Sequence, residues 1–127
     1  MKSLFTVYVI FLLVSFSVKE GGSNGEKRTC PKSSIQVIQG PSGSTHYGIP
    51  QYNVMIMNGC ESSCSGVHLS CGQFVSANFI NPKIFNRIVI NDCLVNNGAP
   101  IKFGQILSFT YSNTFKYPIT VTSATCH

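Results

Sequence analysis

The positions of six cysteines constrain the fold of this 127-residue chain more than any other feature of its sequence. Three of them form a central cluster, at Cys60, Cys64 and Cys71. The other three lie far away on both sides, at Cys30, Cys93 and Cys126. Six cysteines allow fifteen pairings, and spacing alone does not choose among them. A central cluster with distant partners predicts that disulfides join both ends of the chain to its middle.

A zinc site is the alternative use of the central cluster. Zinc is held by thiolates and imidazoles, and this segment offers four such groups, Cys60, Cys64, His68 and Cys71. That arrangement would leave three thiols unexplained. Oxidising compartments convert thiols to disulfides, so a secreted chain should carry six oxidised cysteines, no metal and no other cofactor.

The N-terminal segment has the pattern of a secretory signal peptide, which we place at residues 1–17. A short basic start precedes an apolar run, and small residues follow at Ser15 and Ser17. The run is too short to cross a membrane, and we expect no membrane span in the mature chain. A polar, glycine-rich leader at 18–29 is predicted to be flexible. It contains Lys27-Arg28, which is either a dibasic processing site or an ordinary part of the leader.

Residues 30–127 are predicted to form a single cysteine-rich β domain. Apolar residues alternate with polar ones, and β-branched and aromatic residues are frequent. Strands are expected near 34–39, 51–58, 67–71, 87–90, 106–111 and 119–124. Turns are expected at 40–43 and 96–100, and a single helical turn at 82–85. We therefore predict an all-β fold, a compact disulfide-braced sandwich of roughly seven short strands.

The sequence offers little that resembles catalytic machinery. Glycoside hydrolysis needs two carboxylates, yet Glu61 and Asp92 are the only acidic residues after Cys30, and each adjoins a cysteine. His68 alternates with apolar neighbours and is expected on a solvent-facing surface. If every cysteine is paired, no thiol nucleophile remains. We expect a protein that is not an enzyme.

The net charge of +5 favours acidic partners. These include an acidic receptor face and acidic cell-wall polymers, whereas scattered charges and a secreted chain argue against nucleic acid. Candidate contacts are the basic side chains Lys83, Arg87, Lys102 and Lys116, with Tyr47 and Tyr52 as aromatic anchors. Each is equally compatible with a passive surface role, and Tyr52 with a core position.

Several segments together resemble the tapetum determinant family of small secreted plant proteins. They are Ile49–Val54, Asn58–Cys60, Val67–Ser76, Ile80–Pro82, Phe85–Arg87, Asn91–Asn96, Ile106–Tyr111 and Tyr117–Pro118. The resemblance runs from about Cys30 to Cys126. It implies an extracellular signal read by a leucine-rich-repeat receptor kinase, and Lys27-Arg28 matches a dibasic processing feature of the family.

The leading interpretation is thus a secreted protein ligand for a receptor ectodomain in plant cell-fate signalling. A cell-wall carbohydrate-binding module is the alternative, since exposed aromatic rings on a sandwich would suit sugar stacking. The chain has no Trp, however, and its tyrosines are not evenly spaced. A cationic defence protein or protease inhibitor is a third interpretation, which the size and full β core make less suitable.

Overall fold

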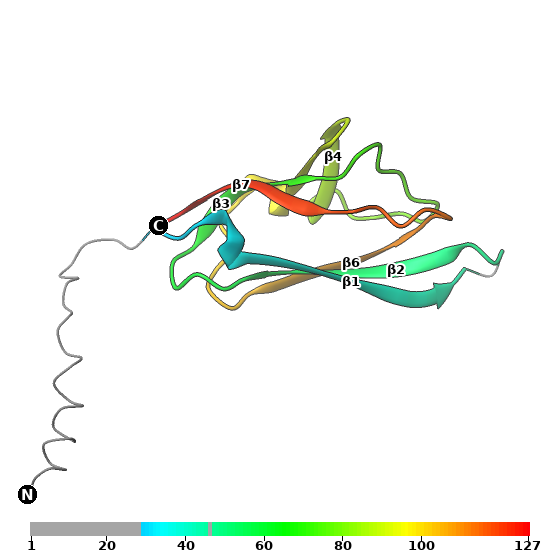
Figure 1. The fold of residues 1–127 in the computed structure, drawn as a ribbon, viewed down its shortest axis with the longest axis horizontal. Coiled ribbons are helices and arrows are strands. Elements are labelled where there is room, and N and C mark those ends of the chain that lie inside the picture. The colour runs from blue at the N-terminus through cyan, green and yellow to red at the C-terminus, as the bar shows by residue number, and fades with distance from the viewer. Residues whose placement is uncertain (1–28, 46) are drawn as a thin grey trace, which may run out of the picture.

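The computed structural model describes residues 29–45 and 47–127, which form two antiparallel β-sheets packed face to face (Figure 1). The predicted all-β sandwich of seven strands is confirmed. The predicted signal peptide, most of the leader and Lys27-Arg28 lie outside the described residues. In the part of the chain that is described, no helix is long and apolar enough to cross a membrane.

The first sheet has three strands in the order β1-β2-β6. These are β1 (Ile35–Ser44), β2 (Pro50–Asn58) and β6 (Ile106–Ser112). The second sheet has four strands in the order β4-β5-β3-β7. They are β4 (Phe85–Val89), β5 (Asp92–Val95), β3 (Cys64–Ser70) and β7 (Thr120–Cys126). Two short 3-10 turns complete the fold, η2 (Lys32–Ser34) and η3 (Asn96–Gly98).

One sequence prediction about β1 is wrong. A turn was expected at 40–43, but β1 continues to Ser44, with Gly40 opposite Asn53 and Pro41 opposite Tyr52. The reason is that β1 is an edge strand, where a proline need not donate a ladder hydrogen bond. The pairing register shifts between Pro41 and Ser44, so the expected turn is replaced by a local irregularity within the strand.

The core lies between the two sheets and follows the alternation in the sequence. Val54 and Ile56 of β2 face Val67 and Leu69 of β3, and all four side chains are fully buried. Aromatic rings fill the rest of the interior, including Phe74, Phe85, Phe109, Tyr111 and Tyr117. The rings of Phe85 and Phe109, one from each sheet, stack with their centroids 4.2 Å apart. This interior contact ties the second sheet to the first.

Three disulfides connect the six cysteines, as Cys30–Cys60, Cys64–Cys126 and Cys71–Cys93. Both ends of the described domain are thus joined to the central cluster, as predicted. The three cysteines considered as zinc ligands, Cys60, Cys64 and Cys71, each belong to a different disulfide. The sulfurs of Cys60, Cys64 and Cys126 nevertheless lie within 4.8 Å of one another, so two disulfides are neighbours.

The first two disulfides place Cys30 and the C-terminal His127 at one end of the sandwich. Figure 1 shows this end on the left, with the β1–β2 turn and the β6–β7 connection on the right. The segment that follows β3 also reaches the right-hand end. This second end carries a hollow in the surface.

Candidate functional site: an apolar groove

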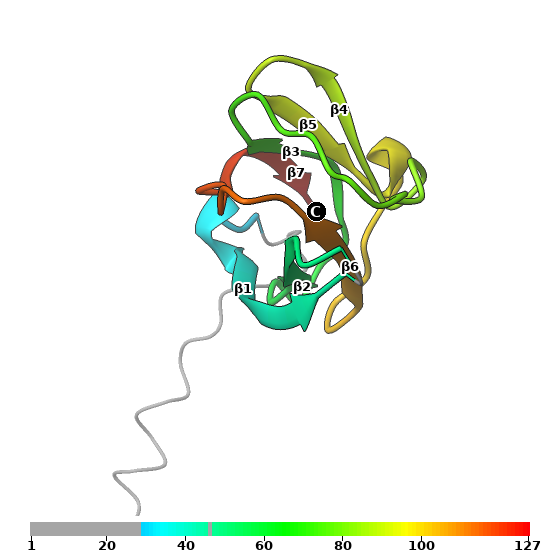
Figure 2. The same ribbon diagram turned by 90° about the vertical axis from the view of Figure 1, so that its right-hand side faces the viewer.

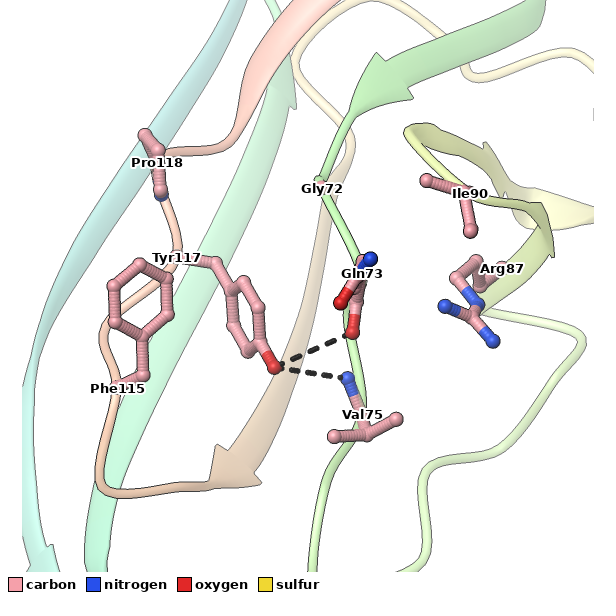
Figure 3. Close-up of a pocket in the computed structure, with 8 residues that line it drawn as sticks. All are labelled: Gly72, Gln73, Val75, Arg87, Ile90, Phe115, Tyr117 and Pro118. Atoms are coloured by element: carbon pink, nitrogen blue, oxygen red, sulfur yellow. Dashed lines mark hydrogen bonds between the residues drawn. The ribbon is translucent and has the colours of Figure 1, made fainter.

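The hollow is a groove of about 620 Å³ between three segments that are distant in sequence. Gln73 and Val75 follow β3, Arg87 and Ile90 belong to the β4–β5 hairpin, and Phe115 and Tyr117 lie between β6 and β7. Figure 3 shows these side chains around the opening, with the Arg87 guanidinium directed toward the Gln73–Val75 segment. We call this site the Tyr117 groove.

Tyr117 is almost completely buried and fixes one wall of the groove. Its hydroxyl accepts hydrogen bonds from the backbone N–H of Val75 (3.3 Å) and from Asn113 Nδ2 (3.1 Å). It also contacts the carbonyl oxygen of Gln73 at 3.4 Å (Figure 3). Asn113 Nδ2 donates in addition to the carbonyl of Val75 (3.1 Å). The β6–β7 connection and the segment after β3 are therefore bound to each other.

A second set of hydrogen bonds, to Tyr111 and Gln39, fixes the backbone of Tyr117. Its backbone N–H donates to the hydroxyl of Tyr111 (3.0 Å), which in turn donates to Gln39 Oε1 (2.7 Å). Gln39 Nε2 then donates to the carbonyl of Tyr117 (2.7 Å), which closes the ring of contacts. Burial raises the pKa of the Tyr111 phenol above its ordinary value. The phenol consequently keeps the proton that it donates to Gln39.

The opposite wall is held by a disulfide and by Asn91. Cys71–Cys93 joins the end of β3 to β5, directly beside the hairpin. The backbone N–H of Asn91 donates to the carbonyl of Gly72 (2.6 Å), and Asn91 Oδ1 accepts from the N–H of Gly72 (3.0 Å). Asn91 has a φ of 66°, a conformation that asparagine tolerates better than most residues. Hydrogen bonds and a disulfide therefore connect all three segments of the groove before any partner binds.

The surface of the groove is mostly apolar. Three large apolar side chains that line the groove, Val75, Ile90 and Phe115, are 54%, 60% and 56% exposed. Val75 and Arg87 also line an adjacent hollow that extends past the exposed ring of Phe79. A contiguous exposed apolar surface on a small soluble domain commonly marks a binding site.

Among the residues that the structure describes, Arg87 is the only one with a charged side chain that lines either hollow. It projects from β4, one of the two edge strands of the second sheet. In Figure 2 the β4–β5 hairpin projects away from the β1-β2-β6 sheet. Within residues 29–45 and 47–127, no acidic side chain forms an ion pair with Arg87. Its guanidinium is thus available to a partner.

The structure separates the other candidate contacts from one another. Lys83 follows Pro82, which lines the adjacent hollow, and Lys116 lines a further hollow beside Tyr117. Tyr47 is highly exposed in the β1–β2 turn at the same end (Figure 1). Lys102 follows Ile101, which is bridged to Cys64 at the start of β3, so Lys102 lies toward the opposite end.

Tyr52 is half-buried and packs against Tyr111 with ring centroids 5.3 Å apart, so a structural role accounts for it. Sequence reasoning missed Val75, Ile90 and Phe115, the apolar part of the groove. Their position next to loops or turns could have indicated this role. An exposed Ile or Phe at such a position is not needed to fill the core. Two of them adjoin asparagine-containing turns, at Asn91 and at Asn113.

His68 occupies the solvent-facing surface of the second sheet, as its alternation predicted. Its Nδ1 lies 2.7 Å from Asp92 Oδ1, and both side chains are about one-third exposed. Asp92, one of the two candidate carboxylates, is therefore engaged by a histidine on the adjacent strand. This pair does not contribute to the Tyr117 groove.

The fold and its surface define a small β-sandwich with three disulfides and a preformed apolar groove. Residues 31–127, which contain this whole sandwich, match the family model described as tapetum determinant 1, C-terminal. The chain belongs to the tapetum determinant 1 family. The resemblance seen in its cysteine-flanking segments is thereby confirmed.

Three relatives from two plants illustrate the similarity. TPD1 protein homolog 1 of Arabidopsis thaliana is 42% identical over 117 residues, covering 91% of this chain and 65% of the relative. TPD1 protein homologs 1B and 1A of Oryza sativa subsp. japonica are 40% and 37% identical over 100 residues. The chain spans less than two thirds of the length of each relative. No solved structure matches the chain.

Proposed function

We propose that this protein is a secreted, non-enzymatic ligand that is recognised by the ectodomain of a leucine-rich-repeat receptor kinase in plant developmental signalling. The observation that carries the proposal is the family match, because it covers all seven strands of the sandwich. The family is described by the name tapetum determinant 1, which associates it with determination of the tapetum. In this proposal the protein acts by surface recognition and needs no cofactor.

The rigidity of the domain supports a recognition role. Three disulfides and the hydrogen bonds of Tyr117 hold the loops in one arrangement. A partner that binds such a surface loses little free energy to loop ordering, because the bound conformation already exists. The long concave face of a leucine-rich-repeat ectodomain could accommodate a compact sandwich of this kind.

The cysteine chemistry supports an extracellular location, in the apoplast. All six cysteines are paired, and paired cysteines persist in oxidising compartments. The predicted signal peptide would deliver the chain there. Acidic cell-wall polymers would then be available as additional partners for the exposed basic side chains.

A cell-wall carbohydrate-binding module is the second candidate function. It is favoured by two exposed phenylalanine rings, Phe79 and Phe115, at the groove end of the sandwich. The two candidates predict different binding partners, so a single capture experiment compares them directly.

The test uses the full chain secreted from cultured plant cells. The secreted protein is incubated with a panel of leucine-rich-repeat ectodomains and, in parallel, with insoluble wall polysaccharides. We expect saturable binding to at least one ectodomain, and its loss after reduction and alkylation of the disulfides. Binding to polysaccharide without binding to any ectodomain would contradict the proposal and favour the carbohydrate-binding function.

A further inference from the structure

We infer that the Tyr117 groove is the main receptor contact, and that it receives a polypeptide segment carrying an aliphatic or aromatic side chain next to an Asp or Glu. This inference rests on the proposed function and adds the contact surface and the chemistry of the partner. The groove combines an apolar lining with the guanidinium of Arg87.

The apolar lining indicates what enters the groove. Ile90 and Phe115 are more than half exposed, although neither is needed to fill the interior. Interface energy is concentrated in a few well-packed apolar and aromatic contacts near the centre of the patch. A partner side chain placed between these residues would bury apolar area on both sides. The walls of the groove are already fixed by Tyr117 and Asn91, so the groove does not have to form on binding.

Arg87 specifies the charge of the partner segment. An arginine fork binds a carboxylate through two parallel hydrogen bonds, and apolar surroundings strengthen that contact. Burying Arg87 against an uncharged partner would leave a desolvated cation without a counter-charge, which is unfavourable. The occupant should therefore supply a carboxylate beside its apolar side chain.

A second copy of this chain does not fit the groove well. In a two-fold dimer through this surface, Arg87 would approach its own symmetry mate. Among the described residues only Glu61 and Asp92 carry carboxylate side chains. Asp92 is already paired with His68, and Glu61 adjoins Cys60 at the other end of the sandwich, outside such an interface. The carboxylate is thus expected from a different protein.

A polysaccharide is also a poor occupant. Sugar binding needs many polar partners for hydroxyl groups, but the polar side chains that line the groove are Gln73, Arg87 and Tyr117. The hydroxyl of Tyr117 already has three protein contacts. The lining suits an apolar side chain with one carboxylate better than it suits a row of hydroxyls.

The experiment measures affinity of full-chain variants for the ectodomain captured by the wild-type protein. Arg87→Glu and Phe115→Ser change the groove. Lys32→Glu and Phe103→Ser are the matched controls, because Lys32 lies in η2 near Cys30 and Phe103 is 59% exposed in the β5–β6 connection. We expect each groove variant to weaken binding at least about tenfold, and each control to change it less than about twofold. Thermal unfolding of all four proteins separates loss of binding from loss of fold.

A charge exchange gives the second readout. Each exposed Asp or Glu of the ectodomain is replaced by Arg in turn, and we expect one such variant to recover binding to Arg87→Glu. Tight wild-type binding that both groove variants retain would overturn the groove assignment and leave the ligand function standing. Failure of the wild-type protein to bind any ectodomain would overturn both. Loss of polygalacturonate binding in Arg87→Glu, without ectodomain binding, would reassign the groove to a carbohydrate.

Discussion

The backbone N–H of Tyr117 donates a 3.0 Å hydrogen bond to the phenol oxygen of Tyr111, which is itself fully buried. This contact anchors the β6–β7 connection to β6, and with it one wall of the Tyr117 groove. The integrity of the groove therefore depends on a hydroxyl in the core.

Tyr111→Phe is expected to lower the free energy of unfolding at neutral pH by roughly 2 kcal/mol, because Gln39 Oε1 and the N–H of Tyr117 lose a buried partner. Thermal or urea unfolding measures this loss. Tyr52→Phe, at the half-buried ring that packs against Tyr111, is the matched control. An unfolding free energy equal to that of the wild type would show that the hydroxyl has no structural role.

The same phenol makes stability sensitive to alkaline pH. The pKa of Tyr111 is raised in the folded state by burial, relative to an ordinary value of 10.0. Above that value the unfolded chain releases the proton that the folded chain still binds, so stability falls as pH rises. We expect urea midpoints measured from pH 8 to 11 to decline less steeply in Tyr111→Phe than in the wild type. Identical slopes would contradict this assignment.

Asn58 is predicted to be the most important polar side chain in the core. Its Nδ2 donates to the carbonyls of Ser62 (2.9 Å) and Ile101 (2.8 Å), and its Oδ1 accepts from the N–H of Cys60 (2.7 Å). Asn58→Ala should cost about 3 kcal/mol, since these buried groups lose their partner. Denaturant unfolding tests this, with exposed Asn53→Ala as the control. Equal losses of unfolding free energy in the two variants would contradict a special role for Asn58.

Cys30→Ser is expected to cause disulfide exchange within the domain. The freed thiol of Cys60 would lie within 4.8 Å of both sulfurs of the Cys64–Cys126 disulfide. Attack by the Cys60 thiolate would break the Cys64–Cys126 bond, form a disulfide to one of these cysteines and release the other as a thiol. Non-reducing peptide mapping should therefore find Cys60 linked to Cys64 or Cys126. The double variant Cys30→Ser/Cys60→Ser lacks the nucleophile and should keep Cys64–Cys126 intact, and an unreacted Cys60 in the single variant would refute the exchange.

Cleavage after Arg28 is expected to release an intact domain, because the first disulfide begins at Cys30 and no disulfide includes an earlier residue. Replacing Lys27 and Arg28 with Ala should leave secretion and folding unchanged, lengthen the extracellular form and lower its receptor activity. N-terminal sequencing and a signalling assay check this. If the leader is still present in the wild-type protein and the variant signals normally, the pair is an ordinary part of the leader.

The sequence predicted the parts of the fold that depend on local pattern. Alternation placed Val54, Ile56, Val67 and Leu69 in the core, and the cysteine positions indicated that the ends are joined to the centre. It failed at Gly40 and Pro41, because a turn signal and a tolerated edge-strand proline look alike without knowledge of strand order.

The groove could be predicted only in small part. Arg87 was singled out because basic residues are conspicuous in a chain with few charges. Its position next to Ile90 and Phe115 depends on how the β4–β5 hairpin and the β6–β7 connection approach the segment after β3. Those approaches are set by tertiary contacts such as Cys71–Cys93 and Tyr117–Val75, which no short sequence window contains.

The shared placement of Cys30 and His127 has a practical consequence for how this protein can be handled. Both lie at the end of the sandwich that is joined to the central cysteines, whereas Tyr117 and its groove lie beyond the other end of β7. A fluorophore or biotin attached after His127 would stand a full strand length away from the groove. Molecules immobilised through that tag would all present the groove outward, so a sensor surface or a bead would display a uniform orientation.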